Sequence, residues 1–159
     1  MNHGTGKPPL DAYDRKILAC LQDDATTPVA GIAERVNLSH NACWRRIKRL
    51  EEAGFILRRV ALLNAAALGL DMTVFVSIRA SEHSGEWLNH LKAVVRDIPE
   101  VVEFYRMTGE VDYLLKVRVA SIAAYDAVYQ RLIREVRLND VSSAFSMEEI
   151  KYSTALPLD

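Results

Sequence analysis

The sequence predicts an α+β chain: a winged-helix-like helix-turn-helix followed by a ferredoxin-like βαββαβ sandwich. Three observations support this. Up to residue 54, apolar residues recur at the three- and four-residue spacing of helices. Beyond residue 72, alternating strand-like runs exchange with two amphipathic helical stretches, and a dense group of cations lies within residues 45–49. We expect the helix-turn-helix domain over residues 1–60, a linker over 61–72 and the second domain over 73–159.

Length and composition fit a packed protein of one medium or two small domains. The chain has 159 residues, 50% of them hydrophobic, and a formal net charge of −1. No apolar run reaches the roughly 18–20 residues of a membrane span, and the first ten residues lack the apolar core of a secretory signal. We expect a cytoplasmic protein with no membrane partner.

Residue patterns typical of catalysis or metal binding are missing from the sequence. Cys20 and Cys43 sit at helical core positions and form no CxxC pair, and the histidines are scattered. There is no glycine-rich phosphate loop, no GxSxG and no pair of catalytic carboxylates on one element. The sequence therefore predicts a protein that is not an enzyme and that carries no metal or cofactor.

The first two predicted helices are short and amphipathic. Residues 10–22 repeat apolar side chains on one face, with Asp11 and Asp14 near the first turn, where carboxylates suit the helix dipole. The next helix follows DDATTP, with Thr27 as its N-cap. It ends at Asn37, a residue type that tolerates the left-handed conformation.

The third predicted helix is strongly basic and begins almost at once after the second. Ser39 is its N-cap and Gly54 closes it. Two helices with so short a joint, the second rich in cations, describe a helix-turn-helix. On a helical wheel the core stripe is formed by Cys43, Ile47 and Leu50. The side chains opposite or flanking that stripe are Asn41, Trp44, Arg45, Arg46, Lys48, Arg49 and Glu51.

Positive charge is concentrated in the first part of the chain. Residues 1–59 carry ten Lys/Arg and seven Asp/Glu, a net of +3, whereas residues 60–159 carry ten and fourteen, a net of −4. A basic element on a near-neutral protein is the footprint expected for nucleic-acid binding, although charge alone fits a solvated helix face about equally well. The cations fill the first two-thirds of the third helix and the acids come last, which favours double-stranded DNA as the partner.

The second half alternates strands and helices in a regular order. Between the halves, FILRRVALLN predicts an extended segment and AAALGL a short helical connector. Apolar residues on both faces of the first strand, such as Phe75 beside Val74, predict that another subunit covers the sheet. The expected elements are a strand over residues 72–80, a helix over 85–98, strands over 101–107 and 111–119 joined by a turn at Gly109, a helix over 121–136 and a strand over 141–153.

In this order the motifs resemble those of the Lrp/AsnC family, also called feast/famine regulators. The resemblance covers residues 10–152 and rests on DRKILACLQDDA, GIAERVNLS, CWRRIKRLEEAGFI, ALLN, TGEVDYLLKVRV and MEEIKYS. It implies a transcriptional regulator with an N-terminal helix-turn-helix and a C-terminal ligand-sensing RAM domain. It also implies homodimers through the RAM sheets, often assembled as rings of four dimers, an octamer. Small effectors, mostly amino acids, are implied to bind between dimers.

Two details refine the resemblance. Ala42 stands where family members often carry Pro, so the first turn of the third helix presents Asn41 differently, which leaves its base preference open. The residues CW at 43–44, SGEW at 84–87 and the ending IKYSTALPLD resemble a branch that includes a cysteine-responsive regulator. That likeness makes cysteine a candidate effector.

The predicted DNA-binding residues belong to the third helix. Asn41 and Arg45 are expected to reach base edges, because Asn pairs with adenine and Arg with guanine through two hydrogen bonds. Arg46 and Arg49 either contact phosphates or pair with glutamates one turn away, and Trp44 either packs or contacts DNA. The full predicted set is Ser39, His40, Asn41, Trp44, Arg45, Arg46, Lys48 and Arg49.

The resemblance maps the effector pocket onto the turn MTGEVDY and the last strand. Backbone N–H groups of residues 108–111 are expected to bind an amino acid's carboxylate, with Gly109 allowing close approach, and Asp112 its ammonium group. The alternative is that Gly109 only makes the hairpin and Asp112 only stabilises it. The predicted set is Met107, Thr108, Gly109, Glu110, Val111, Asp112, Tyr113, Ala144, Phe145 and Ser146.

Effector binding between dimers is expected to change the geometry of the assembly, and with it how well several helix-turn-helix pairs engage DNA together. Two other functions are open. One is an architectural DNA-binding protein without a ligand, whose second domain serves only assembly. The other is a sensing domain associated with an enzyme, against which the complete helix-turn-helix argues.

Overall fold

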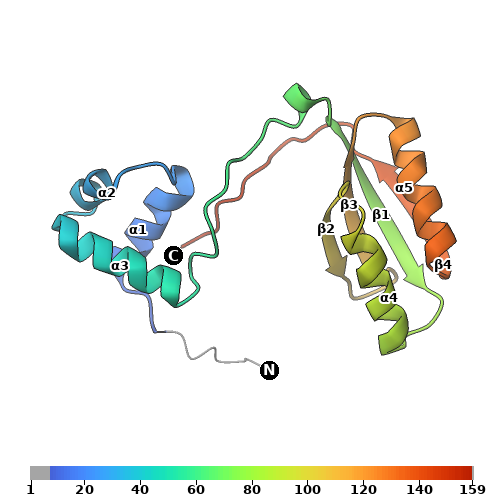
Figure 1. Cartoon of the computed structure of the whole chain (residues 1–159), viewed down its shortest axis with the longest axis horizontal. Coiled ribbons are helices and arrows are strands. Elements are labelled where there is room, and N and C mark those ends of the chain that lie inside the picture. Colours follow the sequence, from blue (N-terminus) through green and yellow to red (C-terminus); the bar gives the residue numbers. More distant parts are fainter. Residues whose placement is uncertain (1–7, 159) are drawn as a thin grey trace. The chain divides into compact units, whose positions relative to one another are not determined.

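The computed structural model describes residues 8–158, which form two compact units (Figure 1). The first unit contains the described residues up to Leu62 together with residues 151–158, and the second runs from Leu63 to Ile150. The sequence alone predicts residues 151–158 as part of the second domain, whereas their contacts put them in the first unit. They pack in the first unit because Leu158 contacts its core and Leu156 hydrogen-bonds to Gln22.

The first unit opens with two helices, α1 (Ala12–Asp23) and α2 (Val29–Arg35). Asp11 is the N-cap of α1 and forms a capping box, in which Asp11 and Asp14 each accept a hydrogen bond from the other's backbone N–H, at 2.8 and 3.1 Å. The predicted N-cap of α2 was wrong: the cap is Pro28, without a side-chain hydrogen bond. The preceding turn is organised instead by Asp24, which accepts from the backbone and hydroxyl of Thr26.

Helix α3 (His40–Glu52) follows α2 as predicted. The Ser39 hydroxyl accepts from the backbone N–H of Ala42 at 3.3 Å and caps the helix. Asn37 has a φ of 55°, the left-handed conformation that reverses the chain between the two helices. The helices enclose one core, formed mainly by Ile17, Leu18, Ile32, Ala33, Val36, Cys43, Ile47 and Leu50.

The connection between the units has little regular structure. Residues 55–64, predicted to be an extended segment, contain no strand, and no other segment of the described chain pairs with them. The predicted helical connector is a single 3₁₀ turn, η1 (Ala66–Leu68). Gly69 ends it with a φ of 71°, which favours glycine at this position.

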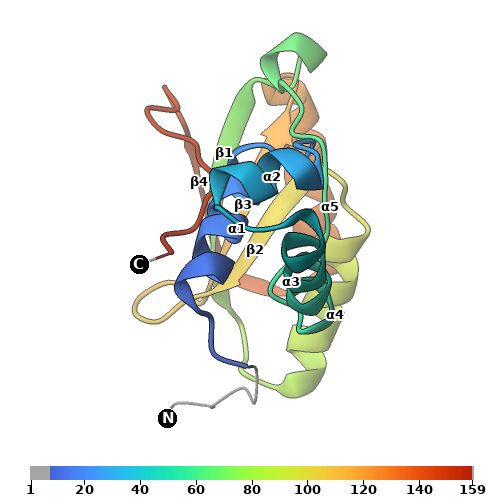
Figure 2. The ribbon, with the colours of Figure 1, turned by 90° about the vertical axis from the view of Figure 1, so that its left-hand side faces the viewer.

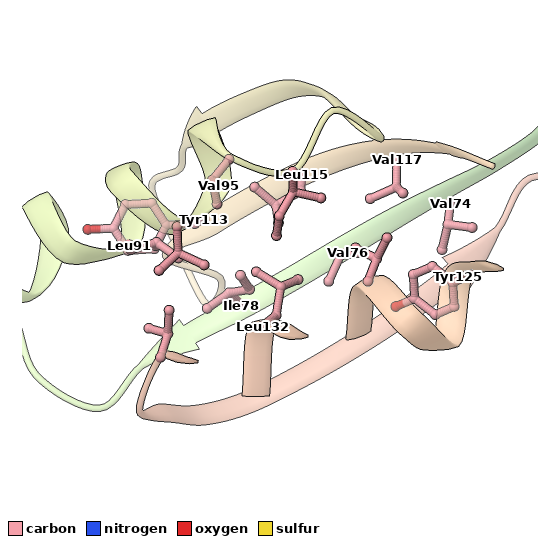
Figure 3. Packing of buried hydrophobic residues seen from close by; sticks show 14 of the residues in the cluster. Val74, Val76, Ile78, Leu91, Val95, Tyr113, Leu115, Val117, Tyr125 and Leu132 are labelled. Carbon is pink, nitrogen blue, oxygen red and sulfur yellow. The ribbon is translucent and has the colours of Figure 1, made fainter. Parts of the chain in front are cut away.

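The second unit is the predicted four-stranded antiparallel sandwich. Strands β1 (Met72–Ala80), β2 (Val101–Arg106), β3 (Tyr113–Val119) and β4 (Leu138–Phe145) lie in the order β2-β3-β1-β4. Helices α4 (Gly85–Arg96) and α5 (Ile122–Glu135) cover one face, as Figures 1 and 2 show. The core lies between the sheet and these helices (Figure 3), and it contains Val74, Val76, Ile78, Leu91, Val95, Leu115, Val117 and Leu132.

The last strand differs from its predicted span. It begins at Leu138 and ends at Phe145, whereas the sequence predicted residues 141–153. Phe145 pairs with Val74, and Ser146 donates its N–H to the carbonyl of Thr73, close to where β1 begins. Beyond that point β4 has no partner strand, so the alternating residues that follow cannot extend the ladder.

Candidate DNA-binding and effector sites

Helix α3 presents a polar face that the rest of its unit leaves open. The opposite side is buried on the core, so His40, Asn41, Arg45 and Lys48 are exposed together. Trp44 keeps 48% of its surface exposed, more than a core residue would. Among the described residues, Arg45 has no ion pair or hydrogen-bonded partner. Arg45 is therefore available to a base edge or a phosphate without losing an existing contact.

The other two arginines of α3 are held by α1. The Arg46 guanidinium lies 2.7 Å from the Asp11 carboxylate and 2.8 Å from that of Asp14, with its carbon 5.4 Å above the centre of the Tyr13 ring. Arg49 pairs with Asp14 as well. Asp14 is fully buried, so both cations neutralise a carboxylate that cannot reach water. Of the two alternatives for these arginines, the structure has ion pairs, but with aspartates of α1 instead of glutamates one turn away.

Glu51 organises the end of the basic helix. It accepts from Lys48 at 3.0 Å and from Arg59 at 3.2 Å. Exposed ion pairs of this kind contribute only about 0–1 kcal/mol, so Lys48 can exchange Glu51 for a DNA phosphate at little cost. The cations available to DNA are thus Arg45 and Lys48. Arg46 and Arg49 instead hold α3 against α1 through their ion pairs.

The pKa of Asp11 lies below its usual range, chiefly because its carboxylate accepts from the backbone N–H of Asp14 and is bonded to Arg46. Its stabilising contribution is therefore fully present above about pH 4 and is lost as pH falls further, when the folded carboxylate protonates. We expect Asp11→Asn to melt below wild type at neutral pH, with the gap closing as pH falls below about 4. Thermal midpoints over a pH series measure this. Asp23→Asn, an exposed change on the same helix, is the control, and a gap independent of pH would contradict the assignment.

The turn between β2 and β3 carries most of the predicted effector residues. The N–H of Met107 donates to the Asp112 carbonyl at 2.8 Å and closes the turn. Gly109 has a φ of 107°, which requires glycine, while a side chain there would meet nothing within 4 Å. The carboxylate of Asp112 accepts from the N–H of Ala80 at 2.8 Å, so it also ties the turn to the end of β1.

Tyr113, also in the predicted set, lies in the core. It is 4% exposed, and its ring centre is 5.7 Å from those of Trp87 and Phe104. Tyr113 therefore packs in the core beside the turn. Glu110 lies at the other extreme: its side chain is 91% exposed and sits 3.6 Å from Arg79.

Within one chain the two parts of the predicted effector site do not meet. The turn bonds to Ile78 and Ala80 at one end of β1, through Asp112. Ala144, Phe145 and Ser146 lie at the other end, beside Phe75, Val74 and Thr73. At about 3.3 Å per residue, the stretch of strand from Val74 to Ile78 alone spans about 13 Å, longer than an amino acid. A site that uses both parts needs more than one copy of the chain.

One hollow of the second unit lies away from the predicted effector residues. In the second unit, a hollow of about 420 Å³ is lined by residues of α5 and β4, including Tyr129, Ile133 and Asp140, and by none of the predicted effector residues. Within residues 8–158, no group of three or more His, Cys, Asp or Glu is arranged to hold a metal ion. None of the helices in the same residues has the length and apolar character required to cross a bilayer.

Sequence reasoning identified the exposed face of α3 but missed the partners of its arginines. Asp11 and Asp14 were interpreted only as dipole-compensating residues of α1. Their i, i+3 spacing next to Tyr13 is the available signal, because it places both carboxylates near one face of the helix. Sequence alone does not say that α3 crosses that face.

The first unit is a helix-turn-helix with an open basic face. The second is a sandwich whose β2–β3 turn is fixed by hydrogen bonds. Together they are the arrangement of a DNA-binding regulator with a sensing domain. Residues 10–56 match the winged helix-turn-helix DNA-binding model, and residues 73–156 match the Lrp/AsnC ligand-binding domain. The chain belongs to the Lrp/AsnC family of transcriptional regulators, which are not enzymes.

Similar proteins cover the whole architecture. A glutamate uptake regulatory protein of Zymomonas mobilis is 54% identical over 149 residues, which is 94% of this chain and 91% of that protein. The crystal structure of an AsnC family transcriptional regulator from Agrobacterium tumefaciens is 58% identical, with a TM-score of 0.91 over 94% of this chain and 97% of that one. A Neisseria meningitidis regulator in complex with L-Met is 34% identical, with a TM-score of 0.90 over 95% and 98% of the two chains.

Proposed function

We propose that this regulator reads DNA with the open face of α3 and that an amino acid, bound between copies of the chain, controls how well it does so. Asn41 and Arg45 contact base edges, and His40 and Lys48 contact phosphates. Ser39, the N-cap of α3, lies next to the DNA backbone. The observation that carries this assignment is that Arg45, on the face opposite the core, has no ion-pair or hydrogen-bond partner within residues 8–158. Trp44 joins this face as a half-exposed flank. We assign Arg46 and Arg49 a positioning role instead of a phosphate contact.

We place the effector between the β2–β3 turn of one copy and the end of β4 of another. Separation of these segments in the single chain supports this, as does the exposure of Phe75, 39% of whose surface is open on the sheet face away from the helices. The related regulator bound to L-Met supports an amino acid as the ligand class. A homodimer through the open sheet face, assembled further to an octamer in the cytoplasm, completes the proposal. Cysteine remains the first candidate to try.

A melting-temperature panel of free amino acids, with cysteine kept reduced, tests the proposal. A ligand at ~100 times its dissociation constant that binds only the folded state adds ~2.7 kcal/mol, which a melt resolves. A stabilising amino acid that also changes the affinity of the protein for its DNA supports effector control. DNA binding with no response to any amino acid favours the ligand-free architectural function, and light scattering that shows a monomer contradicts the shared site.

Asp112 offers a substitution that separates two roles. Asp112→Asn keeps an oxygen for the Ala80 N–H but removes the charge that attracts an ammonium group, so we expect effector affinity to fall about tenfold or more with a nearly unchanged melt of the free protein. Asp112→Ala loses both and costs a further ~1 kcal/mol of stability. Calorimetric titration with the stabilising amino acid measures the first effect. Asp126→Asn, exposed on α5, is the control, and unchanged affinity in Asp112→Asn would leave Asp112 with only its structural bond.

A further inference from the structure

Residues 151–158, which we call the return segment, pack on the helix-turn-helix domain. The side-chain amide of Gln22, on α1, donates to the Leu156 carbonyl at 3.1 Å and accepts from the Leu156 N–H at 2.6 Å. Leu158, at the end of the segment, packs against the core of the domain. Gln22 thus provides a polar attachment of the segment to the first unit, and Leu158 makes an apolar one.

The sequence of the return segment suits this attachment. A residue before proline is restricted to extended conformations, and Pro157 follows Leu156. In an extended residue the N–H and the C=O point to the same side, so both can pair with one side-chain amide. Pro157 has no N–H, which ends the pairing at Leu156. Pro157 therefore lowers the conformational entropy lost when Leu156 docks.

The return segment lies along an apolar groove of the same unit. The groove holds about 590 Å³ and is lined by Leu10, Leu18, Leu21, Phe55, Leu156 and Leu158, among others. Leu156 itself remains 70% exposed, so the docked segment fills the groove only in part. The two hydrogen bonds to Gln22 are exposed and contribute little stability, so this attachment can open and close without unfolding either unit.

The chain just before the return segment is anchored in the second unit. Glu149 pairs with Arg118 of β3 at 2.6 Å, three residues after Ser146 of the proposed effector site. Fully extended, the chain from Glu149 to Leu156 reaches at most about 25 Å. We propose that the return segment is a second, reversible tether of the helix-turn-helix domain to the effector domain. This inference rests on the proposed function.

A second tether has a measurable consequence for DNA binding. When two domains are bound to one assembly, the affinity for paired half-sites depends on how closely the domains are confined, whereas the affinity for one half-site does not. Docking of the return segment confines the domain, so its loss should lower the preference for paired over single half-sites. The face of α3 is unaffected by that loss, because Gln22 and Leu158 are outside the proposed DNA-binding set.

The test compares wild type with Gln22→Ala and Leu158→Ala in the full chain, with Gln130→Ala, exposed on α5, as the matched control. Hydrogen–deuterium exchange by mass spectrometry measures whether the return segment is docked. The preference for paired half-sites is measured by binding to duplexes that are selected from a random pool and carry one or two half-sites. We expect both variants to exchange severalfold faster in residues 151–158 and to lose at least threefold of the paired-site preference, with unchanged single-site affinity.

The outcomes distinguish failure of the tether from failure of the proposed DNA-binding function. Wild-type exchange in residues 151–158 as fast as in both variants overturns the docking, even if DNA binding is normal. Faster exchange in the variants with an unchanged paired-site preference overturns the tether. A wild-type chain that binds no selected duplex overturns the proposed DNA reading, while slow exchange in the return segment would still establish the docking.

Discussion

Asp14→Asn is expected to destabilise the helix-turn-helix domain more than any other single polar change in it. Asp14 is fully buried and neutralises Arg46 and Arg49 together, while its carboxylate also accepts from the N–H of Asp11. Removal of one partner of a buried ion pair costs about 3–5 kcal/mol, and we expect the lower end because both arginines are partly exposed. The loss should lower the thermal midpoint of this domain by roughly 10 °C or more.

Urea and thermal unfolding of the full chain, followed by tryptophan fluorescence, measure this effect, with Trp44 reporting on the first unit and Trp87 on the second. Asp23→Asn is the matched control, because it makes the same change at an exposed position of α1. A variant as stable as that control would mean that Arg46 and Arg49 do not depend on Asp14. In that case they would return to the set of residues available for phosphates.

Arg45→Ala is expected to weaken binding to the selected DNA site by ~1–3 kcal/mol and to relax preference at one base pair. Arg45 has no other partner among the described residues, so the substitution should leave the stability of the protein within about 0.5 kcal/mol of wild type. Arg49→Ala should show the opposite profile, with lost stability and little change in base preference, because its guanidinium is paired with Asp14.

Titrations of wild type and variants against the selected site and single-base variants of it, at one fixed salt concentration, separate these profiles. Arg96→Ala, exposed on α4, controls for the loss of a positive charge elsewhere. If Arg45→Ala weakens binding equally on all sequences, Arg45 contacts a phosphate instead of a base.

Local rules predicted the elements well where one physical signal dominated. Ser39 as the cap of α3 and β1 over Met72–Ala80 follow from a side-chain acceptor and from strict alternation, neither of which needs a distant partner. The end of β4 was predicted too late, because a strand ends where its neighbour does, and β1 begins at Met72, one residue beyond Thr73. The predicted N-cap of α2 was also wrong. In the turn before α2, it is the Asp24 carboxylate that accepts a backbone N–H, that of Thr26.

The sequence by itself determined the two-part architecture, the basic third helix and the turn around Gly109, because periodicity, capping and glycine conformation are properties of neighbouring residues. Only the tertiary structure decided which cations are free. Asp14 and Arg46 are 32 residues apart in sequence, and their pairing depends on how α1 and α3 pack. The same holds for Gln22 and Leu156, and for the separation of the turn from the end of β4 along β1. Such relations depend on the packing of distant segments, which no local pattern encodes.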